Sequence, residues 1–505
     1  MLVDEHALVA QTRSLVDIAN YLGDTGLSLA QLAGIEITEV ASSTETVIPG
    51  ALFVAHRGIR SHGADYVEGA ISAGAVAILT DKEGESKISA HGEVAVPVLV
   101  VSRPEVDLGH LAHWFHGDPM RSMHAVGVTG TNGKSTITTL LYEIWQAAGF
   151  TAGLMGTIAT LMPGIEMSAE RTTESADEIA RRVAQMAQLH VRSLAMEVSS
   201  HGLALDRING AKFAAVGFSN LSQDHLDFHG DMESYFNAKA SLFTYEYGQR
   251  AFINIDDAYG RRLAAMTSLE SMTLSLTDKS ASWFVTDREA TARGNRLEIR
   301  GPGGLLISTE IPLIGTHNVE NYLMAIALAV DSGVDPTVIE SASHSLKGAR
   351  GRMERIELGQ SFTALVDYGH SPDAVTRVLS SIRESSSGRI IALLGCGGDR
   401  DRSKRPLMGQ ALASGADVAI FTSDNPRSED PSVILNEMTA GLAITSPSRI
   451  EIDRKSAIQY AISLAEPGDV VIVLGKGHER GQYFKDHVEE FDDRLEVAKA
   501  IEGRR

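Results

Sequence analysis

A glycine-containing loop between an apolar run and a helical segment constrains the fold more than any other feature of the sequence. Residues 124–130 read HAVGVTG, and from residue 135 the segment STITTLLYEIWQAAGF carries apolar side chains at helical spacing. This order predicts a buried strand, a loop and a helix that ends at Gly149, where a helix C-cap would fall. The backbone N–H groups of such a loop and the helix N-terminus can bind phosphate. The feature therefore predicts an α/β fold with a phosphate site at a strand end.

Short apolar runs alternate with helical segments along the rest of the chain, which predicts three α/β domains. The 505 residues are enough for about three domains of roughly 100 to 200 residues each. Residues 1–118 contain the runs ALFVAHRG, AVAILT and VPVLVVS and end before Pro119. Residues 119–349 add LAMEVSS, FAAVGFSN, RAFINID and a stretch typical of antiparallel strands, NRLEIRGPGGLLISTEIPLIG. Residues 350–505 contain FTALVDY, RIIALLG, VAIFTS and DVVIVLG between helical segments, which predicts a parallel sheet with crossover helices.

Composition and charge exclude several classes of protein. The chain is 43% hydrophobic and 22% charged, which is typical of a folded, soluble protein. A net charge of −20 repels nucleic acid, so an anionic ligand must be met by local basic side chains and backbone N–H groups. The N-terminal stretch MLVDEHALVAQTRSLVDIANYL has early acids and no apolar run of about 18 residues, and Cys396 is the single cysteine. We expect a cytoplasmic protein without membrane insertion, intrachain disulfide or cysteine-rich zinc site.

The loop itself is similar to a P-loop, with one departure. In the segment VTGTNGKST, Lys134 would reach the terminal phosphates of a nucleotide and Ser135 would bind Mg²⁺. The strict pattern requires a glycine where Val128 stands. A structural glycine turn is the alternative to nucleotide binding, and a nucleotide-binding switch is the alternative to an enzyme.

Lys239 falls inside an apolar stripe, where a charge is costly. A helix over DMESYFNAKASLF would place on one face Met232, Tyr235, Phe236, Lys239, Leu242 and Phe243. Burial lowers the pKa of a lysine, and the neutral amine can be carbamylated by CO₂ to give a carboxylate that binds Mg²⁺. The alternative is that the side chain extends to water or pairs with an acid such as Asp231 or Glu233.

Three more polar side chains follow predicted strands. Glu197 ends the apolar part of LAMEVSS, where its carboxylate would face the phosphate loop as a Mg²⁺ ligand or act as a cap. His225 and His229 lie in SNLSQDHLDFHGD after the next strand. A His-x-x-x-His pair favours zinc only on a helix with further ligands, so Gly230 and the loop position favour a Mg²⁺ or phosphate-facing role for one histidine.

These motifs, in their order along essentially the whole chain, resemble those of the Mur ligase family. The matching segments are GTNGKST, MEVSSHGLALDR, SNLSQDHLDFHGDMESYFNAKASLF, GTHNVENYLMAI, GRMERIE, VDYGHSPDAV, GCGGDRDRSKRPLM, SDNPR and LGKGHE. The resemblance implies an N-terminal α/β domain that binds the UDP substrate, a central P-loop ATPase-like mixed sheet, and a C-terminal Rossmann-like domain that binds an amino acid. It implies an ATP-dependent, amide-forming ligase that adds the third stem-peptide residue to UDP-N-acetylmuramoyl-L-alanyl-D-glutamate through an acyl phosphate, in peptidoglycan synthesis. A folylpolyglutamate synthetase shares the phosphate loop and the lysine, but the long N-terminal domain and SDNPR argue against it.

The resemblance also implies which residues bind ATP. The loop residues in this set are Gly130, Thr131, Asn132, Gly133, Lys134, Ser135 and Thr136. Asn318 and Asn321 would lie near adenine, and Arg352 and Asp367 would reach ATP from the last domain. Helix caps or ion pairs are the alternative roles for these four side chains.

Two Mg²⁺ ions are implied as well. Ser135 and Glu197 would hold the first ion, and His225 and Lys239, carbamylated to N6-carboxylysine, would hold the second. The implied catalytic residues are Lys134, Glu197, His225 and Lys239.

The muramoyl dipeptide would be bound by hydroxyl groups and an arginine, which suit its carboxylates and amides. The implied residues are Thr172, Thr173, Ser199 and Arg207. At the uridine site the family's usual Asp-Ser-Arg is replaced by Ser43-Thr44-Glu45. Thr44 keeps a hydroxyl group there, but an acid replaces the arginine.

Within the family, SDNPR resembles enzymes that add meso-diaminopimelate. The residues that map onto the amino-acid pocket are Arg400, Asp424, Asn425, Arg427, Gly475 and Glu479. Arg427 would pair with the second carboxylate of this diacid, whereas it would repel the side-chain ammonium of lysine. Lysine or another diamino acid is the alternative substrate, and a surface helix cap is the alternative role for Arg427. Small molecules are the expected partners, and we expect a monomer.

Overall fold

The structure, a computed structural model, describes residues 11–58, 61–92, 94–291 and 293–504. Contacts divide the chain into two compact units. The first extends to Leu274 and includes Asp331–Gly333, and the second comprises Ser275–Val330 and Val334 onward. The first ten residues of the N-terminal stretch, on which part of the membrane prediction rests, lie outside the described ranges. Within those ranges no helix is both long and apolar enough to cross a membrane.

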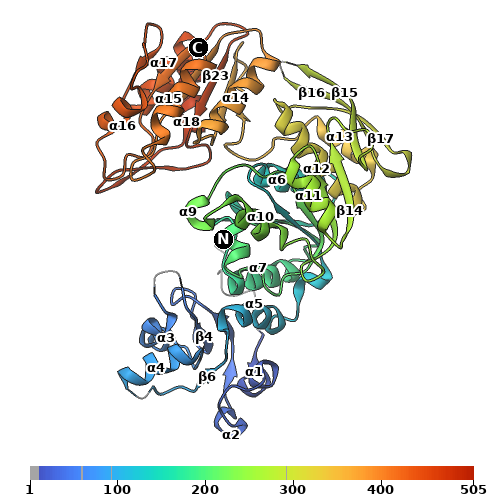
Figure 1. The fold of residues 1–505 in the computed structure, drawn as a ribbon, viewed down its shortest axis with the longest axis vertical. Coiled ribbons are helices and arrows are strands. Elements are labelled where there is room, and N and C mark those ends of the chain that lie inside the picture. The colour runs from blue at the N-terminus through green and yellow to red at the C-terminus, as the bar shows by residue number, and fades with distance from the viewer. Residues whose placement is uncertain (1–10, 59–60, 93, 292, 505) are drawn as a thin grey trace. The chain divides into compact units, whose positions relative to one another are not determined.

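A parallel four-stranded sheet begins the first unit. Its order is β3 (Glu39–Ala41), β4 (Ala51–Ala55), β5 (Ala77–Thr80) and β6 (Val98–Val100). The helices α1 (Leu15–Leu22), α3 (Val67–Ala73), α4 (Lys82–His91) and α5 (Pro104–Phe115) surround it (Figure 1). Side chains of β4 alternate between two cores: Leu52 and Val54 pack with α1 and α5, and Phe53 and Ala55 pack with α3. The predicted N-terminal strands are confirmed.

Smaller elements complete this part of the first unit. They are the antiparallel pair β1 (Arg13–Ser14) and β2 (Glu36–Ile37), α2 (Leu29–Leu32), and the 3₁₀ turns η1 (Gly63–Tyr66) and η2 (Pro119–Ser122). Pro119 is the first residue of η2, which leads into the next sheet.

A larger sheet occupies the rest of the first unit. Its strands there are, in spatial order, β10 (Ile165–Ser168), β9 (Ala159–Met162), β8 (Ala152–Met155), β11 (Ser193–Glu197), β7 (His124–Thr129), β12 (Phe213–Phe218), β13 (Gly248–Asn254) and β14 (Glu270–Ser275). The six strands from β8 to β14 in this order are parallel, and β9 and β10 run antiparallel to their neighbours. The predicted strand, loop and helix at residues 124–149 are confirmed by β7 and α6 (Lys134–Ala147), because Gly149 follows the helix with φ +78°.

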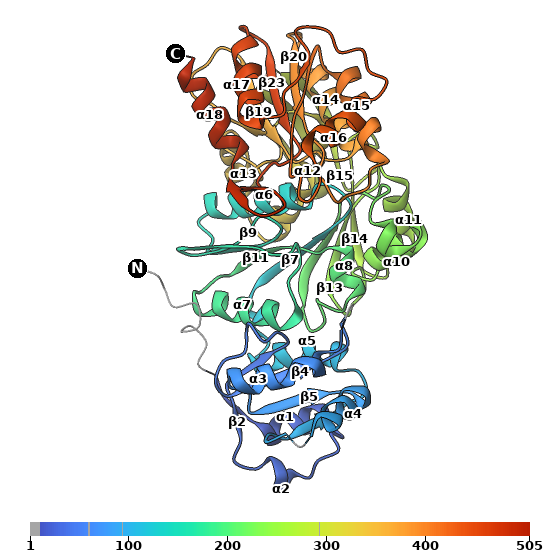
Figure 2. The same cartoon turned by 90° about the vertical axis from the view of Figure 1, so that its left-hand side faces the viewer.

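Helices cover both faces of this sheet. In Figure 2, α6 lies on one side of β7 and β11, and α7 (Ala176–Gln188) lies on the other. Leu194 and Met196 of β11 pack with Ile179, Val183 and Met186 of α7. Since side chains alternate along a strand, the residue at position 197 points to the opposite face, where α6 lies. The other helices of this unit are α8 (Ser200–Ala204), α9 (Leu226–His229), α10 (Met232–Ala240) and α11 (Ala258–Met266).

The second unit begins with antiparallel strands, as predicted. β15 (Trp283–Thr291), β16 (Gly294–Arg300) and β17 (Leu306–Ile311) pair in order, with η3 (Pro302–Gly304) between the last two. The helices α12 (Thr316–Asp331) and α13 (Pro336–Ser343) follow.

The second unit ends with a six-stranded sheet. Its order is β18 (Glu354–Arg355), β19 (Thr363–Asp367), β23 (Val470–Leu474), β20 (Ile390–Leu394), β21 (Val418–Phe421) and β22 (Arg449–Ile450). All neighbours are parallel except β18 and β19. The crossover helices are α14 (Pro372–Ser385), α15 (Lys404–Gly415), α16 (Pro431–Met438) and α17 (Arg454–Leu464); the hairpin β24 (Gly481–Tyr483) and β25 (Val488–Glu490) and α18 (Asp493–Gly503) follow. The predicted parallel sheet is confirmed.

The α/β class is confirmed, and two details differ from the expectations. The helix that carries Lys239 ends at Ala240, so Leu242 and Phe243, although buried, lie in the turn after it and not on its face. The contact-based units do not divide the chain at residues 118 and 349. Each of the two parallel-stranded sheets near the chain ends nevertheless falls within one predicted domain, and the three-domain boundaries stay a prediction.

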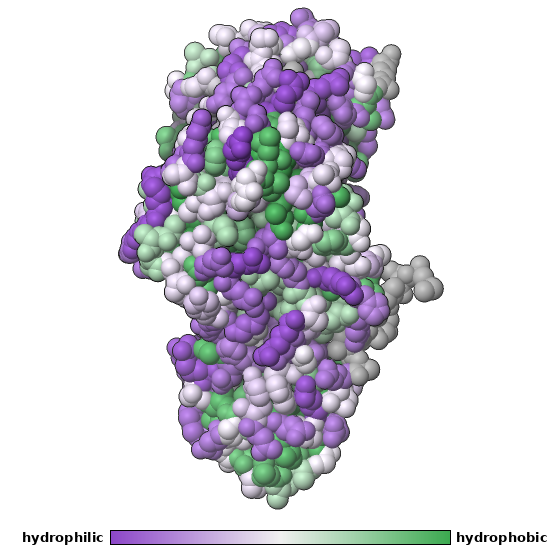
Figure 3. All heavy atoms as spheres, turned by 90° about the vertical axis from the view of Figure 1, so that its right-hand side faces the viewer, coloured by the Kyte–Doolittle hydropathy of each residue, from purple (hydrophilic) through white to green (hydrophobic). Residues whose placement is uncertain are grey.

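Hydrophilic side chains cover much of the face shown in Figure 3, with smaller hydrophobic areas between them. A small set of charged side chains is buried instead, and Glu197, Lys239, Asp367, Asp424 and Lys476 are among them. Because a buried charge is costly without partners, these side chains mark places where the fold supports chemistry or tight polar packing.

Candidate functional site

The phosphate loop connects β7 to α6 and is held by the segment after β12. The backbone N–H of Thr131 donates to the carbonyl of Asn220 (2.8 Å), and that of Asn132 donates to Asn220 Oδ1 (3.0 Å). Gly130 has φ +147°, and a Cβ there would lie 1.9 Å from Ser219 Oγ. Only glycine allows the two segments to pass this closely. The loop therefore has a fixed shape at the carboxyl edge of the parallel strands, where α/β sheets bind ligands.

Lys134 and Ser135 open α6 beside the loop. Lys134 Nζ donates to the carbonyls of Gly130 (2.8 Å) and Thr131 (3.1 Å). Ser135 Oγ donates to Glu197 Oε2 (2.9 Å). Gly133 is the residue before the helix and has a left-handed backbone conformation. Because α6 begins directly after the loop, the positive end of its dipole points toward the loop. An ammonium group, a hydroxyl group and the helix N-terminus are thus brought together as a polyphosphate would require.

Glu197 is 2% exposed at the end of β11. Its Oε1 accepts from the backbone N–H of Thr157 (2.8 Å), and the hydroxyl groups of Thr157 (3.0 Å) and Ser135 (2.9 Å) approach Oε2. These donors support a carboxylate in a buried position. Thr157 was not among the predicted residues, because its partner lies 40 residues away and no local pattern indicates the contact.

Lys239 is 1% exposed on α10. Its Nζ donates to the carbonyl of Gly130 (2.9 Å) and lies 4.7 Å from the centre of the Tyr235 ring. Burial, followed by the nearby charge of Lys134, lowers the pKa of Lys239 well below the usual value for lysine. The side chain is therefore disposed to be a neutral amine beside the phosphate loop.

The alternatives for Lys239 do not occur in the structure. The side chain does not extend to water, because it is buried. Asp231 instead caps α10 by accepting from the backbone N–H of Ser234 (2.7 Å). Glu233 forms an ion pair with Arg262 (2.5 Å).

Three histidines gather near α10. The His201 ring lies 4.8 Å from that of His225 and 5.6 Å from that of His229, measured between ring centres. His225 precedes α9 with φ +53°, and the Tyr235 ring lies 6.2 Å away. Burial lowers the pKa of all three imidazoles, to about 4 for His201. Neutral imidazoles at this position can bind a metal ion or donate to a phosphate oxygen.

The residues expected to hold Mg²⁺ are partly brought together. Ser135 and Glu197 are hydrogen-bonded, and the charge of Lys239 is close enough to His225 to contribute to its lowered pKa, although burial contributes most. In the described ranges, no group of three or more His, Cys, Asp and Glu residues could hold a metal ion. A hydroxyl and a carboxylate still suit Mg²⁺, whose remaining ligands are commonly phosphate and water oxygens.

The four residues expected at the muramoyl dipeptide gather at the end of β11. Thr173 Oγ1 donates to the carbonyl of Glu197 (3.0 Å) and accepts from the backbone N–H of Ser199 (2.9 Å). Arg207 Nη1 donates to the carbonyl of Thr173 (3.0 Å), while Thr172 Oγ1 lies 3.0 Å from Thr157 Oγ1. The Thr173 hydroxyl is buried and both of its contacts are internal, which makes it a support for its neighbours.

Ser43-Thr44-Glu45 forms the turn after β3. The backbone N–H of Glu45 donates to Ser43 Oγ (3.3 Å), the Glu45 side chain is exposed, and Thr44 is half-buried. The preceding Ser42 is bound by Asp177 of α7, which accepts from its backbone N–H (2.7 Å) and its hydroxyl group (2.9 Å). These two bonds fix the turn to α7, and the uridine contact stays a prediction.

In the second unit, the two asparagines expected near adenine are adjacent on α12 and buried. Asn318 Nδ2 donates to the carbonyl of Ile314 (2.8 Å), and Asn321 Nδ2 donates to Asn318 Oδ1 (3.3 Å). The chain of bonds fixes the orientation of both amides.

Arg352 and Asp367 are also brought together. Asp367 ends β19 and accepts from the backbone N–H groups of Met353 (2.8 Å) and Gly369 (2.7 Å). Burial raises the pKa of Asp367, and the charge of Arg352 opposes this. The Arg352 guanidinium lies 4.5 Å from the centre of the Tyr368 ring. The pair forms a polar patch at the carboxyl end of a parallel strand.

Most residues of the expected amino-acid pocket meet where β21 and β23 end. Asn425 Nδ2 donates to Glu479 Oε2 (2.8 Å), and the backbone N–H of Asn425 donates to Asp424 Oδ1 (2.6 Å). Gly475 has φ +110°, and a Cβ there would lie 2.7 Å from Asp424 Oδ2. Glycine is therefore required for Asp424 to occupy its position.

Arg427 lies beside Arg400 in this pocket. Arg427 Nη1 donates to the carbonyl of Gly398 (2.7 Å), and a Cβ on Gly397 would lie 3.0 Å from that nitrogen and 3.6 Å from Arg400 Cγ. The role of Arg427 as a helix cap is wrong, because Asp430 caps α16. The Arg427 guanidinium instead supplies positive charge next to the Gly397 turn.

Lys476 is a pocket residue that the sequence did not indicate. It is 0% exposed, and its Nζ donates to Asn425 Oδ1 (2.8 Å), Glu479 Oε2 (3.2 Å) and the carbonyl of Gly481 (2.7 Å). The sequence predicted its neighbours Gly475 and Glu479 as pocket residues. The hydrogen bond from Lys476 to Asn425 joins residues 51 positions apart, so no local sequence pattern indicates it.

Three family models match consecutive parts of the chain. "Mur ligase family, catalytic domain" matches residues 36–116, "Mur ligase middle domain" matches residues 128–329, and "Mur ligase, glutamate ligase domain" matches residues 351–477. The three matches therefore correspond, in order, to the four-stranded N-terminal sheet, the larger central sheet and the six-stranded C-terminal sheet.

Similar proteins match nearly the whole chain. A UDP-N-acetylmuramoyl-L-alanyl-D-glutamate–2,6-diaminopimelate ligase of Streptomyces avermitilis is 41% identical and the match covers 94% of this chain and 96% of the relative. A ligase of the same name from Geobacillus thermodenitrificans is 39% identical, with 93% and 96% covered. A solved structure of a ligase with this name has a TM-score of 0.68 at 32% identity and covers 93% of this chain and 95% of its own.

Proposed function

The chain belongs to the Mur ligase family, and from this premise we propose that it joins meso-diaminopimelate to UDP-N-acetylmuramoyl-L-alanyl-D-glutamate at the expense of ATP. The observation that carries the proposal is a likeness of 41% identity to a relative named for this reaction, over 94% of the chain. The product would carry the third residue of the peptidoglycan stem peptide. We propose that the protein is cytoplasmic, where its single, buried cysteine would stay reduced. We also propose that it acts as a monomer on small-molecule substrates.

The first chemical step is formation of an acyl phosphate. The D-glutamate carboxylate attacks the γ-phosphorus of ATP, the bond to the bridging oxygen breaks, and ADP leaves. The loop N–H groups and Lys134 stabilise the charge on the phosphate oxygens. The contacts that fix the loop to Asn220 support this role, because they orient the donors before ATP binds.

The second step forms the amide. The amine of the incoming amino acid attacks the acyl carbon, loses a proton, and phosphate leaves from the tetrahedral intermediate. The carboxylate of Glu479 is suited to the ammonium end of the diamino acid, and Arg427 to its distal carboxylate. The hydrogen bond between Asn425 and Glu479 and the position of Arg427 beside Arg400 support this assignment.

Two Mg²⁺ ions would bind near the loop, with phosphate oxygens completing their ligands. Bound Mg²⁺ supplies positive charge to the transferring phosphoryl group. Ser135 and Glu197 would hold one ion, and His225 with a carboxylated Lys239 would hold the other. For the second, the neutral amine of Lys239 attacks CO₂, an N–C bond forms and one proton is released, so that lysine becomes a carbamate. Its burial and lowered pKa support this reaction.

The nucleotide-linked substrate would reach the end of β11. Thr172, Ser199 and Arg207 would contact the dipeptide, with Thr173 as a support, since these residues are hydrogen-bonded around Glu197. Thr44 would contact uridine, and the exposed Glu45 would leave that contact different from the family pattern. Asn318 and Asn321 would contact adenine, and Arg352 and Asp367 the rest of ATP.

Phosphate release tests the proposal. The assay contains ATP, Mg²⁺ and the muramoyl dipeptide, with meso-diaminopimelate, L-lysine or L-ornithine as the amino acid. We expect release to require the dipeptide and to be fastest with meso-diaminopimelate. Faster release with lysine would assign the same reaction to another diamino acid. ATP hydrolysis that is equally fast without the dipeptide would favour a nucleotide-binding switch and contradict the proposal.

A further inference from the structure

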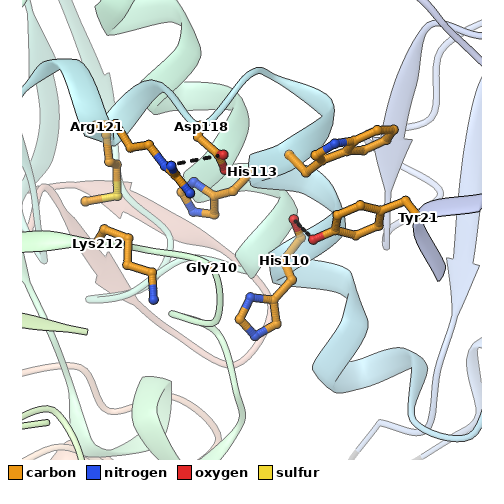
Figure 4. A pocket seen from close by; sticks show the side chains of 9 residues that line it. Tyr21, His110, His113, Asp118, Arg121, Gly210 and Lys212 are labelled. Atoms are coloured by element: carbon orange, nitrogen blue, oxygen red, sulfur yellow. Dashed lines mark hydrogen bonds and ion pairs between the residues drawn. The ribbon is translucent and has the colours of Figure 1, made fainter. Parts of the chain in front are cut away.

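A cavity of about 250 Å³ lies in the first unit, away from the phosphate loop. It is lined by side chains of α1 and α5 and of the segments before β7 and β12, including Tyr21, His110, His113, Met120, Arg121 and Lys212 (Figure 4). Its volume corresponds to about eight water molecules at about 30 Å³ each. The cavity is therefore large enough for a compact organic molecule.

The cavity and the phosphate loop are at opposite edges of the sheet. Arg121 and Lys212 precede the parallel strands β7 and β12, whereas the loop and Ser219 follow them. β7 has six residues, which at about 3.3 Å each separate its ends by roughly 20 Å. A ligand in the cavity would not occupy the ATP site.

His113 is the most unusual side chain in the cavity wall. It is 2% exposed, and neither ring nitrogen has a hydrogen-bond partner among the described residues. Burial, followed by the charges of His116, His110 and Lys212, lowers its pKa to about 3. The ring is therefore neutral and offers one N–H donor and one acceptor. Leaving both unsatisfied is costly, which points to a polar partner inside the cavity.

Two basic side chains, Arg121 and Lys212, line the same cavity as His113 (Figure 4). Arg121 contacts Asp118 through Nε (3.4 Å), which leaves its two Nη groups for another acceptor. Lys212 Nζ donates to the carbonyl of Glu246, which uses one of its three hydrogens. The donors around the cavity thus exceed the single carboxylate that lines it, that of Asp118.

The remaining wall is apolar and aromatic. Met120 is buried, and the Tyr21 ring stacks on Trp114 with 4.5 Å between ring centres. The other face of Trp114 is covered by Arg13, whose guanidinium carbon lies 4.1 Å from the ring centre. An apolar group of a bound ligand would contact Met120 and the edges of the stacked Tyr21 and Trp114 rings.

We propose that this cavity binds a small organic acid. Its carboxylate would accept from His113, Arg121 and Lys212, and its apolar body would lie against Met120 and Tyr21. A carboxylate is favoured over a neutral ligand because charge-assisted bonds from arginine and lysine are stronger than neutral ones. The site is separate from those that the proposed ligase reaction uses, so the inference does not depend on that reaction.

Benzoate is a suitable probe, with inorganic phosphate as an anion that lacks an apolar body. Ligand-observed NMR on the full chain, in the presence of ADP, should give saturable benzoate binding with a dissociation constant in the millimolar range. Lys212→Ala and Arg121→Ala should each weaken binding by about tenfold, which is the loss of one charge-assisted bond. Lys279→Ala removes an exposed lysine elsewhere and should leave binding unchanged.

The imidazole provides a second measurement on the unaltered protein. With ¹⁵N-labelled histidine, benzoate should shift the ring signal that His113→Phe removes. Absence of saturable benzoate binding, or binding that Lys212→Ala and Arg121→Ala leave unchanged, would overturn the proposal. Binding of phosphate without benzoate would also overturn it, because the apolar wall would then have no role. A His113 ring signal that saturating benzoate does not shift would also overturn the proposal, because the carboxylate would then not accept from this imidazole.

Discussion

Lys239 and Lys476 are both buried, but their surroundings differ. Lys239 Nζ donates to one acceptor, the carbonyl of Gly130, and a second cation, Lys134, lies close enough to lower its pKa. Lys476 Nζ donates to three oxygens, one of which belongs to the carboxylate of Glu479. The first lysine lies beside the phosphate loop, and the second supports the expected amino-acid pocket.

The difference shows what a buried lysine can do. A buried charge without a counterion is costly, so the amine is favoured to lose its proton and can then react. A buried lysine whose amine is hydrogen-bonded to a carboxylate and to two further acceptors instead fixes the groups around it. Lys239 is accordingly the candidate for chemical modification, and Lys476 is a positioning residue.

Replacing Lys239 should have the largest effect on activity. In Lys239→Met, we expect kcat to fall by about 10³-fold or more, because the carboxylate that would hold Mg²⁺ is lost. The free energy of unfolding should stay the same or rise, since an uncompensated buried amine is replaced by an apolar side chain. Phosphate release and urea denaturation measure the two quantities.

The exposed Lys279→Met is the matched control for this experiment. It should change neither quantity. Full activity in Lys239→Met would break the comparison, because Lys239 would then be no more than a buried structural lysine.

Replacing Lys476 should mainly affect stability. In Lys476→Met, Glu479 and Asn425 lose their shared donor, and we expect the free energy of unfolding to fall by about 3 kcal/mol. The partial exposure of Glu479 keeps the loss at the low end of the range for a broken buried pair. KM for the amino acid should rise more than KM for ATP. An equal rise in both would contradict the role of Lys476 in the amino-acid pocket.

Replacing Arg427 tests the residue of this pocket that is proposed to contact the substrate itself. Arg427→Ala should lower kcat/KM for meso-diaminopimelate by roughly 50-fold, or about 2.3 kcal/mol, because the distal carboxylate loses a charge-assisted pair. The kcat/KM for lysine should stay the same or rise, because Arg427 would repel the ammonium group of the lysine side chain. Arg449→Ala removes an arginine that pairs with Glu451 on the same sheet, and should leave the preference unchanged. An equal loss with both amino acids would show that Arg427 does not select the diacid.

His113 is buried like the two lysines, but its ring nitrogens have no hydrogen-bond partner among the described residues. Its pKa is about 3 in the folded chain against a usual value of 6.5, so only the unfolded chain takes up its proton as the pH falls below 6.5. Stability from this group is thus present above pH 6.5 and is lost toward pH 3. Between pH 7 and pH 5 the loss is about 2 kcal/mol.

Unfolding of His113→Phe should lack this part of the pH dependence. Denaturation at pH 7 and pH 5 measures it, with the exposed His91→Phe as control. The same slope in wild type and His113→Phe would mean that the imidazole is not held neutral.

Local patterns predicted much of this molecule. The apolar run before Gly130 and the helical spacing after it are enough to predict β7, the loop and α6. The apolar stripe predicted that Lys239 is buried. The end of α10 at Ala240 could not be predicted, because the following Ser241 keeps a helical backbone conformation and no glycine or proline marks the end.

Contacts between distant residues account for what the sequence did not indicate. Thr157 supports Glu197 from another strand connection, and Lys476 joins Asn425 to Glu479. Neither contact depends on a local repeat, since each follows from strand order in a sheet. Family resemblance selected the residues around Lys476 because they were expected to touch substrate, whereas Lys476 only supports them.

The central claim is that Lys239, and not Lys476, is the reactive lysine of this ligase. ¹³C NMR of the protein in ¹³C-bicarbonate with Mg²⁺ tests it most directly. We predict a carbamate carbon signal in wild type and in Lys476→Met, and no such signal in Lys239→Met. A wild-type protein without the signal, or a signal that persists in Lys239→Met, would contradict the claim.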